Sequence, residues 1–281
     1  LQPFPHVAAE TYGPLYFVGT PKGSSGYKSL QFSLTRRMSK GLAAQISYNL
    51  SRAVGNSETG FDETWDEGAG IQDIYSLAAS ANTVVSYDQT HVFKGYIAFE
   101  LPMGRNRRFL SNLNPALDAV LGGWEVAGIV RYNSGNPLGV YANVWYPGWE
   151  GPVYADYDDT VNLSRQFRSE QFDPAAPNAA GNRYFNPAAF SNPQEHNLGN
   201  GKRMYSRLRG FGYAGEDLSL MKTIRASERI HMQVRAEFLN VFNRHYFANP
   251  NTNMGNATTF GYVTSTTGNP RIIQFGLRLD W

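Results

Sequence analysis

The sequence predicts an all-β fold: an antiparallel transmembrane β-barrel, of which this chain supplies seven or eight strands. Three observations predict it: segments that alternate strictly between apolar and polar residues, many aromatic residues and glycines, and long polar stretches after every second strand. The clearest segment is the last one, Arg271–Trp281. Ile273, Phe275, Leu277 and Trp281 share one face there, because successive side chains of a strand point to opposite sides.

Composition agrees with this fold and excludes others. The 281 residues carry a net charge of +2, which indicates no strongly charged partner and no nucleic-acid role. No apolar run approaches the roughly 20 residues of a membrane-spanning helix. Cysteine is absent, so disulfide frameworks and thiolate metal sites are excluded. With 17 Tyr, 17 Phe, 5 Trp and 28 Gly, the chain suits strands, turns and aromatic belts better than helices.

The first strands form a predicted hairpin. Tyr27–Met38 and Leu42–Ser51 both alternate, and the turn Ser39-Lys40-Gly41 between them contains a glycine that is free to adopt positive φ. Leu15–Gly19 is a weaker candidate for an eighth strand. Further strands are predicted at His91–Leu101, Trp124–Ser134, Glu216–Ile224, Ile230–Phe242 and Arg271–Trp281, with a short helix at Pro115–Leu121.

Connections between these strands alternate strictly between short and long. The long ones are Arg52–Thr90, Gly135–Gly215 and Asn243–Pro270, which show no sustained periodicity. Strict alternation places every short turn at one end of the sheet and every long loop at the other. Barrels of the bacterial outer membrane have this arrangement, with short periplasmic turns and long extracellular loops. The predicted location is therefore the outer membrane, with its lipid as a partner.

The alternation also assigns residues to the two faces of the barrel wall. The apolar set is predicted to face lipid: Ile46, Tyr48, Phe93, Ile97, Phe99, Trp124, Val126, Val234, Phe238, Phe275, Leu277 and Trp281. The polar set is predicted to face the lumen: Gln45, Asn49, Glu125, Arg131, Gln233, Arg235, Glu237, Gln274, Arg278 and Asp280. Mutual salt bridging and hydration account for each polar residue taken singly, so no individual binding residue is identified.

Candidate chemistry is sparse, and no enzyme is predicted. Gly210, Gly212 and Gly215 match the G-x-G-x-x-G spacing, but a loop precedes them and a strand follows. A nucleotide site requires a strand before and a helix after, so close turning of the backbone is the better interpretation. No nucleophile elbow or acid–base pair is present, and no catalytic or cofactor-binding residue is predicted.

Two acidic clusters are weak candidates for a cation site. Asp156, Asp158 and Asp159 form one, and Asp62, Glu63, Asp66 and Glu67 form the other. Calcium prefers several loop oxygens, but neither cluster has the spacing of an EF-hand loop. Solvated loop charge is the simpler interpretation, and no metal is predicted.

Several short blocks, in order along the chain, resemble the C-terminal part of Oar-like TonB-dependent outer-membrane receptors. The blocks are Tyr27-Lys28-Ser29-Leu30-Gln31-Phe32-Ser33-Leu34, Asn49-Leu50-Ser51-Arg52, Leu121-Gly122-Gly123-Trp124-Glu125-Val126-Ala127-Gly128, Tyr184-Phe185-Asn186-Pro187-Ala188-Ala189-Phe190, Arg235-Ala236-Glu237-Phe238-Leu239-Asn240-Val241-Phe242-Asn243 and Phe247-Ala248-Asn249-Pro250-Asn251. Their ordered series is more specific than any single block.

The resemblance implies a barrel of about twenty-two strands with an N-terminal plug inside it. Residues 1–281 are then the C-terminal part of that barrel, and the plug and the N-terminal strands are expected outside this chain. The implied function is uptake or binding of a substrate at the cell surface. The implied partners are the missing strands, the plug and, through the complete receptor, a periplasmic energy-coupling protein.

Other functions stay open from the sequence alone. A small eight-stranded barrel acting as an anchor or adhesion module is one of them, and it requires Leu15–Gly19 to close the barrel. A secreted β-sandwich that binds glycans through its aromatic loops is another. An outer-membrane hydrolase is the third, although no catalytic triad is identifiable.

Overall fold

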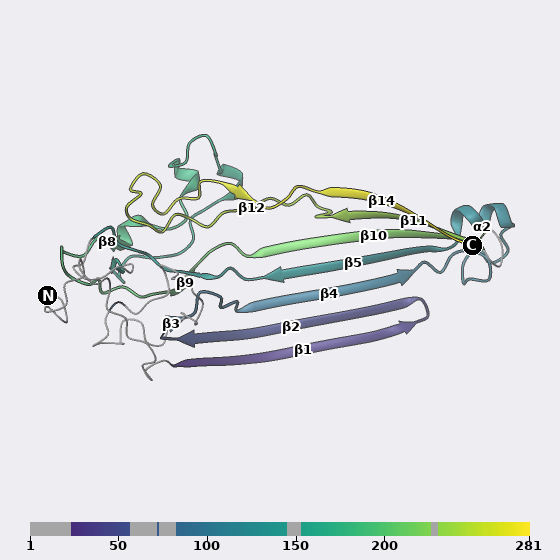
Figure 1. The fold of residues 1–281 in the computed structure, drawn as a ribbon, viewed down its shortest axis with the longest axis horizontal. Coiled ribbons are helices and arrows are strands. Elements are labelled where there is room, and N and C mark those ends of the chain that lie inside the picture. Colours follow the sequence, from purple (N-terminus) through teal and green to yellow (C-terminus); the bar gives the residue numbers. More distant parts are fainter. Residues whose placement is uncertain (1–23, 57–71, 73–82, 145–152, 226–229) are drawn as a thin grey trace, which may run out of the picture.

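The computed structural model describes residues 24–56, 72, 83–144, 153–225 and 230–281. Within them, seven long strands lie side by side in one antiparallel sheet, in the order in which they occur in the chain (Figure 1). A short strand, β3 (Thr83–Val84), extends the sheet beside β2. The long strands are β1 (Ser25–Ser39), β2 (Leu42–Gly55), β4 (His91–Glu100), β5 (Trp124–Asn133), β10 (Tyr213–Arg225), β11 (His231–Leu239) and β14 (Ile272–Asp280).

All seven clearly predicted strands are therefore confirmed, although their bounds differ by one to four residues. β2 extends to Gly55, four residues beyond the predicted end at Ser51. β10 begins at Tyr213, three residues before the predicted start at Glu216, because it keeps its pairing with β5 up to Tyr213↔Asn133. β11 ends at Leu239 rather than at Phe242. The reason is a turn in which Asn240 and Asn243 adopt φ of 52° and 50°, values that interrupt an extended strand. The weaker candidate strand Leu15–Gly19 lies outside the described residues.

The short connections gather at one end of the sheet, as the sequence predicts. β1 and β2 are joined by Lys40 and Gly41, which take φ of 53° and 78°. The connection from β4 to β5 contains the helix α2 (Pro115–Leu121), as expected. Asn114 caps it by accepting a 2.8 Å hydrogen bond from the amide of Leu117. The C-terminus lies at this same end (Figure 1).

The other helices in the described residues are single 3₁₀ turns at the opposite end. They are η1 (Ser169–Gln171), η2 (Ala180–Asn182) and η3 (Pro187–Ala189). No helix in the described part of the chain combines the length and the apolar character needed to cross a membrane.

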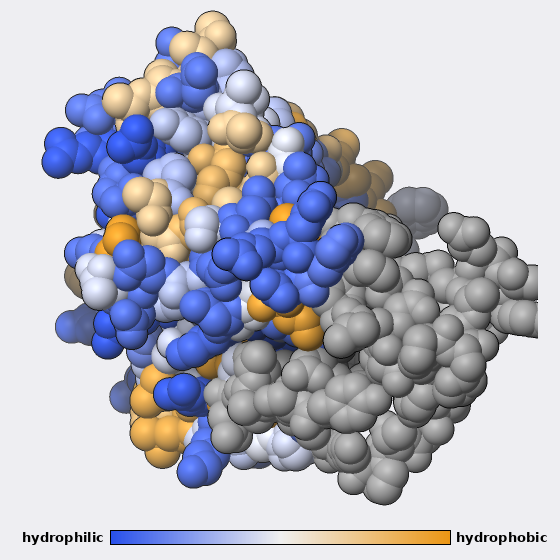
Figure 2. All heavy atoms as spheres, turned by 90° about the vertical axis from the view of Figure 1, so that its left-hand side faces the viewer, coloured by the Kyte–Doolittle hydropathy of each residue, from blue (hydrophilic) through white to orange (hydrophobic). Residues whose placement is uncertain are grey.

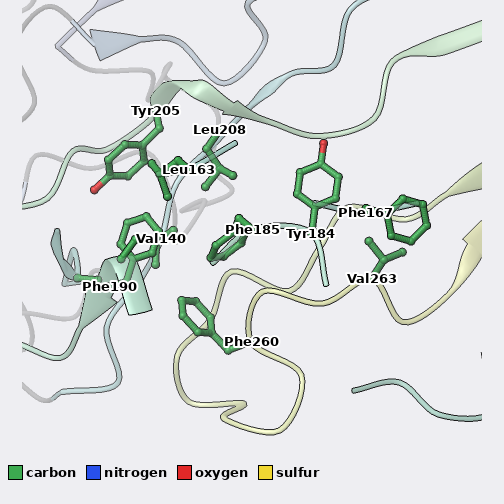
Figure 3. Packing of buried hydrophobic residues seen from close by; sticks show 12 residues of the cluster. Val140, Leu163, Phe167, Tyr184, Phe185, Phe190, Tyr205, Leu208, Phe260 and Val263 are labelled. Carbon is green, nitrogen blue, oxygen red and sulfur yellow. The ribbon is translucent and has the colours of Figure 1, made fainter. Parts of the chain in front are cut away.

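The long connections fold together into a packed unit at the loop end, which we call the cap. It contains three small two-stranded sheets. Its largest hydrophobic cluster combines residues from the β5–β10 connection with Phe260 and Val263 from the β11–β14 connection. Phe185 and Phe190 pack edge to face near its centre, with ring centroids 5.7 Å apart (Figure 3). The small strands pair as β6 (Pro137–Leu138) with β9 (Tyr205–Arg209), β7 (Asp156–Tyr157) with β8 (Phe190–Ser191), and β12 (Tyr246–Phe247) with β13 (Thr266–Thr267).

The cap corrects the expectation that Gly135–Gly215 is an irregular region. The described residues of this connection hold most of the fully buried hydrophobic side chains, including Phe185 and Leu208. By contrast, every residue of β1 is exposed. The long sheet has no second large sheet packed against it among the described residues, so the hydrophobic core lies in the loops. This arrangement rules out the secreted β-sandwich, whose core lies between two sheets.

The packing of the cap generates the first prediction. Phe185→Ala removes a fully buried ring, and the resulting cavity should lower the stability of the cap by about 3–5 kcal/mol. Protease added to intact cells should then cut the cap faster, while the heat-dependent electrophoretic mobility of the barrel stays unchanged. Phe109→Ala, at the turn end, removes a ring that is 53% exposed and serves as control. Equal cleavage rates for the two variants would contradict a packed cap.

Candidate membrane-spanning wall and loop cap

Pairing between neighbouring strands fixes two faces for the whole sheet. Residues directly opposite each other in an antiparallel ladder share a face. Ile46 lies opposite Leu34 and Gly95, and Gln45 lies opposite Thr35 and Tyr96. The same division continues without a slip through β5, β10 and β11 to β14. We call the Ile46 side the apolar face and the Gln45 side the polar face.

The predicted lipid-facing and lumen-facing sets are separated completely by this register. Every predicted lipid-facing residue within a strand lies on the apolar face, and every predicted lumen-facing residue lies on the polar face. Trp281 is the exception, because β14 ends at Asp280 and Trp281 follows it with 90% of its surface exposed. The register does not identify the medium that each face contacts, so lipid on one side and lumen on the other are still predictions.

Charges on the apolar face occur only near the strand ends. On β1, Lys28 and Arg36 share this face and enclose the apolar residues Leu30, Phe32 and Leu34. Eight residues of strand span about 27 Å, close to the roughly 25 Å height of the lipid-facing band in outer-membrane barrels. On β10, Glu216 and Lys222 enclose Leu218 and Leu220 in the same way. The apolar face therefore has the dimensions of a membrane-spanning surface.

The two charges of β10 are each neutralised or directed away from the apolar band. Glu216 is only 5% exposed and forms a two-point ion pair with Arg244, at 2.7 and 2.8 Å, and accepts a 2.6 Å hydrogen bond from the Tyr132 hydroxyl. The Lys222 ammonium lies 5.3 Å from the centre of the Trp124 ring and donates to the carbonyl of Gly122 in the turn. Neither residue is in the sets predicted from the sequence. Extending the alternation from Leu218 in both directions would have placed them on the apolar face.

The polar face carries short-range ionic contacts between predicted residues. Arg235 and Glu237 form an ion pair at 3.3 Å, and Arg278 and Asp280 form one at 3.0 Å. Gln274 donates a hydrogen bond to Glu237. Exposed pairs of this kind contribute about 0–1 kcal/mol each. These weak contacts agree with the interpretation that most residues of the polar face bind one another and water rather than a ligand.

Lys94 and Arg131 differ from those pairs. They lie directly opposite each other on the polar face of β4 and β5. Neither belongs to an ion pair within the described ranges. The Arg131 guanidinium lies 5.7 Å from the centre of the Tyr213 ring, which stacks on Tyr246 at 5.0 Å. The two cations and the two rings form a continuous surface on the polar face.

A pocket of about 490 Å³ opens beside these rings, where the polar face meets the cap. Its lining includes Tyr213, Asp217, Asn240, Tyr246 and Phe247. Asp217 accepts a 2.8 Å hydrogen bond from the amide of Asn240, which fixes the turn that follows β11. The pocket thus combines aromatic surface with hydrogen-bonding groups, as small-molecule sites commonly do.

Buried polar contacts attach the cap to the barrel wall. Asp88 is 2% exposed and pairs with Arg209 of β9 at 2.6 Å. Its other carboxylate oxygen accepts a 2.6 Å hydrogen bond from the amide of Ala53 in β2. The Arg209 guanidinium also donates to the carbonyls of Asp88 and Gly135, at 2.9 and 3.1 Å. One ion pair thereby joins β2, the start of β4 and the β5–β10 connection.

A buried glutamine makes a second attachment. The Gln72 side chain donates to the carbonyl of Gly199 at 2.8 Å and accepts from the amide of Tyr154 at 2.9 Å. Gln72 therefore ties the β2–β4 connection into the cap. Seen from the loop end, much of the visible surface is hydrophilic (Figure 2).

Titratable groups in the cap are shifted by burial and by hydrogen bonds. Burial raises the pKa of the Tyr205 and Tyr246 hydroxyls to about 12 and also raises the pKa of Tyr184. Hydrogen bonds from Thr160 lower the pKa of Asp158, and the hydrogen bond to Glu216 raises the pKa of Arg244. Burial and local hydrogen bonds account for these pKa shifts.

The candidate cation site at Asp156, Asp158 and Asp159 does not assemble. In the described part of the chain, no three His, Cys, Asp or Glu side chains come close enough to hold a metal ion. Asp156 accepts from the amide of Asn200, and Asp158 accepts from Thr160, so both support local turns. Asp159 is exposed. Asp62, Glu63, Asp66 and Glu67 lie outside the described residues.

The glycine motif has a packing role. A Cβ on Gly210 would lie 2.0 Å from the side-chain oxygen of Asn249, and one on Gly212 would lie 2.6 Å from the carbonyl of Asn133. Gly215 lies within β10, so no helix follows the motif. Close approach of the backbone explains these glycines, as the sequence predicts.

Comparison with protein families gives one match. A family model described as an outer membrane beta barrel domain matches residues 2–274. The chain belongs to this outer-membrane β-barrel family. Its location is therefore the bacterial outer membrane, which confirms the predicted fold class and location. Comparison with curated proteins and with solved structures gives no match.

Membership of an outer-membrane barrel family turns the two faces into a testable prediction. Ile46→Arg places a charge within the apolar band and should cost roughly 2–4 kcal/mol of folding free energy near the membrane midplane. Gln45→Arg, one residue away on the polar face, should cost far less. Folding yields of both variants in liposomes provide the comparison. Equal yields would show that the apolar face does not contact lipid.

Alkaline pH should destabilise the cap of this outer-membrane barrel. Tyr205 is 5% exposed, and burial raises its pKa from 10.0 to about 12. Because the folded state favours the neutral phenol, its contribution to stability is complete below pH 10 and is lost as the pH rises through about 12. Tyr205→Phe should lose part of this alkaline sensitivity.

Tyr205→Phe should also lower the stability of the cap at neutral pH. It removes the 3.0 Å hydrogen bond from the Lys202 amide, at a cost of about 1 kcal/mol. Tyr87→Phe alters a tyrosine that is 67% exposed. It should change neither the stability of the cap at neutral pH nor its sensitivity to alkaline pH. Protease resistance of the cap, measured across the alkaline range, provides the readout. Identical profiles for Tyr205→Phe and the unaltered protein would contradict the role given to burial.

Proposed function

We propose that this protein is the C-terminal wall of a larger TonB-dependent receptor barrel, similar to the Oar-like receptors, which binds a solute at the cell surface and takes it up. The observation that carries the proposal is the strand number of the open sheet. Among the described strands, β1 pairs only with β2 along the sheet, and β14 pairs only with β11. Each therefore presents an outer edge without a partner from these strands.

An odd number of strands cannot close an antiparallel barrel. In a meander of seven, the first and last strands run in the same direction, so β1 and β14 are parallel. Single-chain barrels of the bacterial outer membrane have an even number of antiparallel strands. Closure therefore needs an odd number of further strands between β14 and β1. In lipid these edges need partners, since each unsatisfied backbone group costs several kcal/mol.

The polar face supports a role in solute binding rather than in anchoring alone. It combines Lys94 and Arg131, which form no ion pair with any described residue, with the stacked rings of Tyr213 and Tyr246 and with the pocket beside them. A barrel that serves only as an anchor has no need of such a surface. The cap above it supplies a packed scaffold with a hydrophilic exterior, and binding specificity concentrates on such loops.

The blocks that resemble the Oar-like receptors occupy structurally defined places. Tyr184–Phe190 contains the centre of the cap cluster and the turn η3, which Asn186 caps. Arg235–Asn243 contains the end of β11 and the turn at Asn240 and Asn243. The blocks thus correspond to strands of the wall, to the ends of these strands and to the core of the cap. This is the pattern expected when similarity reflects a shared barrel architecture.

The proposed partners follow from this architecture. Further barrel strands pair with the edges of β1 and β14, and a plug lies against the polar face. A periplasmic energy-coupling protein acts through the complete receptor. The protein itself performs no covalent chemistry in this proposal, and binding and passage of the solute constitute its activity.

Closure of the barrel is the test. Residues 1–281, secreted alone into the periplasm, should give a protein that is digested completely by protease and whose electrophoretic mobility does not change on heating. The same residues joined to the strands of the complete receptor should give the heat-dependent mobility of a folded barrel. A small eight-stranded barrel of known folding behaviour serves as control. A folded, heat-sensitive form of residues 1–281 alone would refute the proposal and favour the small anchor barrel.

A further inference from the structure

We propose that the helix α2 lies in the periplasmic leaflet of the outer membrane, with one apolar side in contact with phospholipid. α2 lies beyond the ends of the strands, in the connection from β4 to β5 (Figure 1). Leu117, Val120 and Leu121 have the spacing i, i+3, i+4, so they share one side of the helix. Their surfaces are 49%, 63% and 41% exposed. We call these three residues the outer side of α2.

The other side of α2 faces the protein. Asp118 and Ala119 line a pocket of about 400 Å³ at the turn end, together with Glu100 and Glu125. These two glutamates lie directly opposite each other on the polar face. The Asp118 carboxylate also accepts a 2.6 Å hydrogen bond from the amide of Arg105. The helix is therefore amphipathic, with its polar side toward the lumen and its apolar side toward the surroundings.

Two side chains of the apolar face hold the C-terminal end of α2. The Trp124 indole donates a 3.0 Å hydrogen bond to the carbonyl of Val120, and the Lys222 ammonium donates to the carbonyl of Gly122. Trp124 and Lys222 lie directly opposite each other on the wall. The outer side of α2 is therefore continuous with the apolar face. Tryptophan is enriched at the level of the lipid headgroups, which places α2 at the membrane boundary.

The segment before α2 adds apolar and basic side chains to this surface. Phe109 and Leu110 are 53% and 49% exposed. Arg105 and Arg108 are exposed as well, and the Arg108 guanidinium lies 5.5 Å from the centre of the Phe109 ring. A phospholipid leaflet offers an apolar interior to the first pair and anionic headgroups to the second. The short turns of an outer-membrane barrel lie in the periplasm, so this leaflet is the periplasmic one, whichever solute the protein binds.

The experiment measures the depth of single labelled positions in the complete protein, folded into vesicles of phosphatidylethanolamine and phosphatidylglycerol. Residues 1–281 contain no cysteine, so Val120→Cys, Ile46→Cys and Glu195→Cys each give these residues one site for a fluorophore. A spin label near the headgroups should quench the fluorophore at Val120 most strongly, since interfacial helices insert by about 5–10 Å. A spin label deep in the acyl chains should quench Ile46 most strongly. Neither should quench Glu195, which is exposed in the cap.

Two double variants test the two parts of the surface, each with the fluorophore at Val120. Leu117→Ser with Leu121→Ser should abolish the quenching, because the outer side loses its apolar side chains. Arg105→Gln with Arg108→Gln should weaken the quenching to the level found in phosphatidylcholine vesicles, and lysine at both positions should restore it. Heat-dependent mobility confirms that each variant is folded.

The contrary outcomes are distinguishable. Quenching at Ile46 but not at Val120 overturns the inference and shows that the outer side of α2 lies in water or against protein. A disulfide-linked dimer of Val120→Cys assigns this side to a second copy of the chain. Absence of quenching at Ile46 overturns the membrane assignment of the wall and, with it, the position of α2. Equal quenching in all vesicles and in the arginine variants overturns the preference for anionic headgroups.

Discussion

Satisfaction of backbone hydrogen bonds is the constraint on which the rest of this structure depends. Inside a membrane no water is present to pair with an exposed N–H or C=O group, so a sheet is stable there only when every strand has two neighbours. Among the described strands, the meander of seven long strands meets this condition at five strands and leaves one edge of β1 and one edge of β14 without a partner. The even, antiparallel closure of bacterial barrels then requires additional strands, and the parallel directions of the two edges make their number odd.

The wall was predictable because the alternation of apolar and polar residues within each strand shows which side chains share a face. Alternation identified every long strand and separated the apolar from the polar residues, from Ile46 to Leu277, in agreement with the register. The ends of strands were less predictable. β11 ends because Asn240 adopts a left-handed conformation. The apolar residues Val241 and Phe242 follow it, so the sequence pattern predicts a longer strand. The local sequence pattern is thus sufficient to predict the two faces of a sheet that has an apolar side and a polar side.

The cap was not predictable from pattern, because its contacts join residues that are far apart in the chain. Gln72 bonds to Gly199, Asp88 pairs with Arg209, and Phe185 packs against Phe260 at 5.5 Å. None of these contacts produces a periodic pattern in the sequence. The many Asn, Gly and Pro residues around them predict irregular loops. The same holds for the candidate site. Alternation placed Arg131 on the polar face but gave no sign that Tyr213 and Tyr246 stack beside it.

The shared core of the cap has a consequence for how such surfaces change during evolution. Because the β2–β4, β5–β10 and β11–β14 connections contribute to one packed unit, replacing a single loop with that of a relative leaves Gln72, Asp88 or Phe260 facing a foreign partner. Loop grafting is therefore expected to succeed only when the three segments are exchanged together. Substitutions of exposed side chains on the outside of the cap, by contrast, are expected to leave the packing between the loops intact.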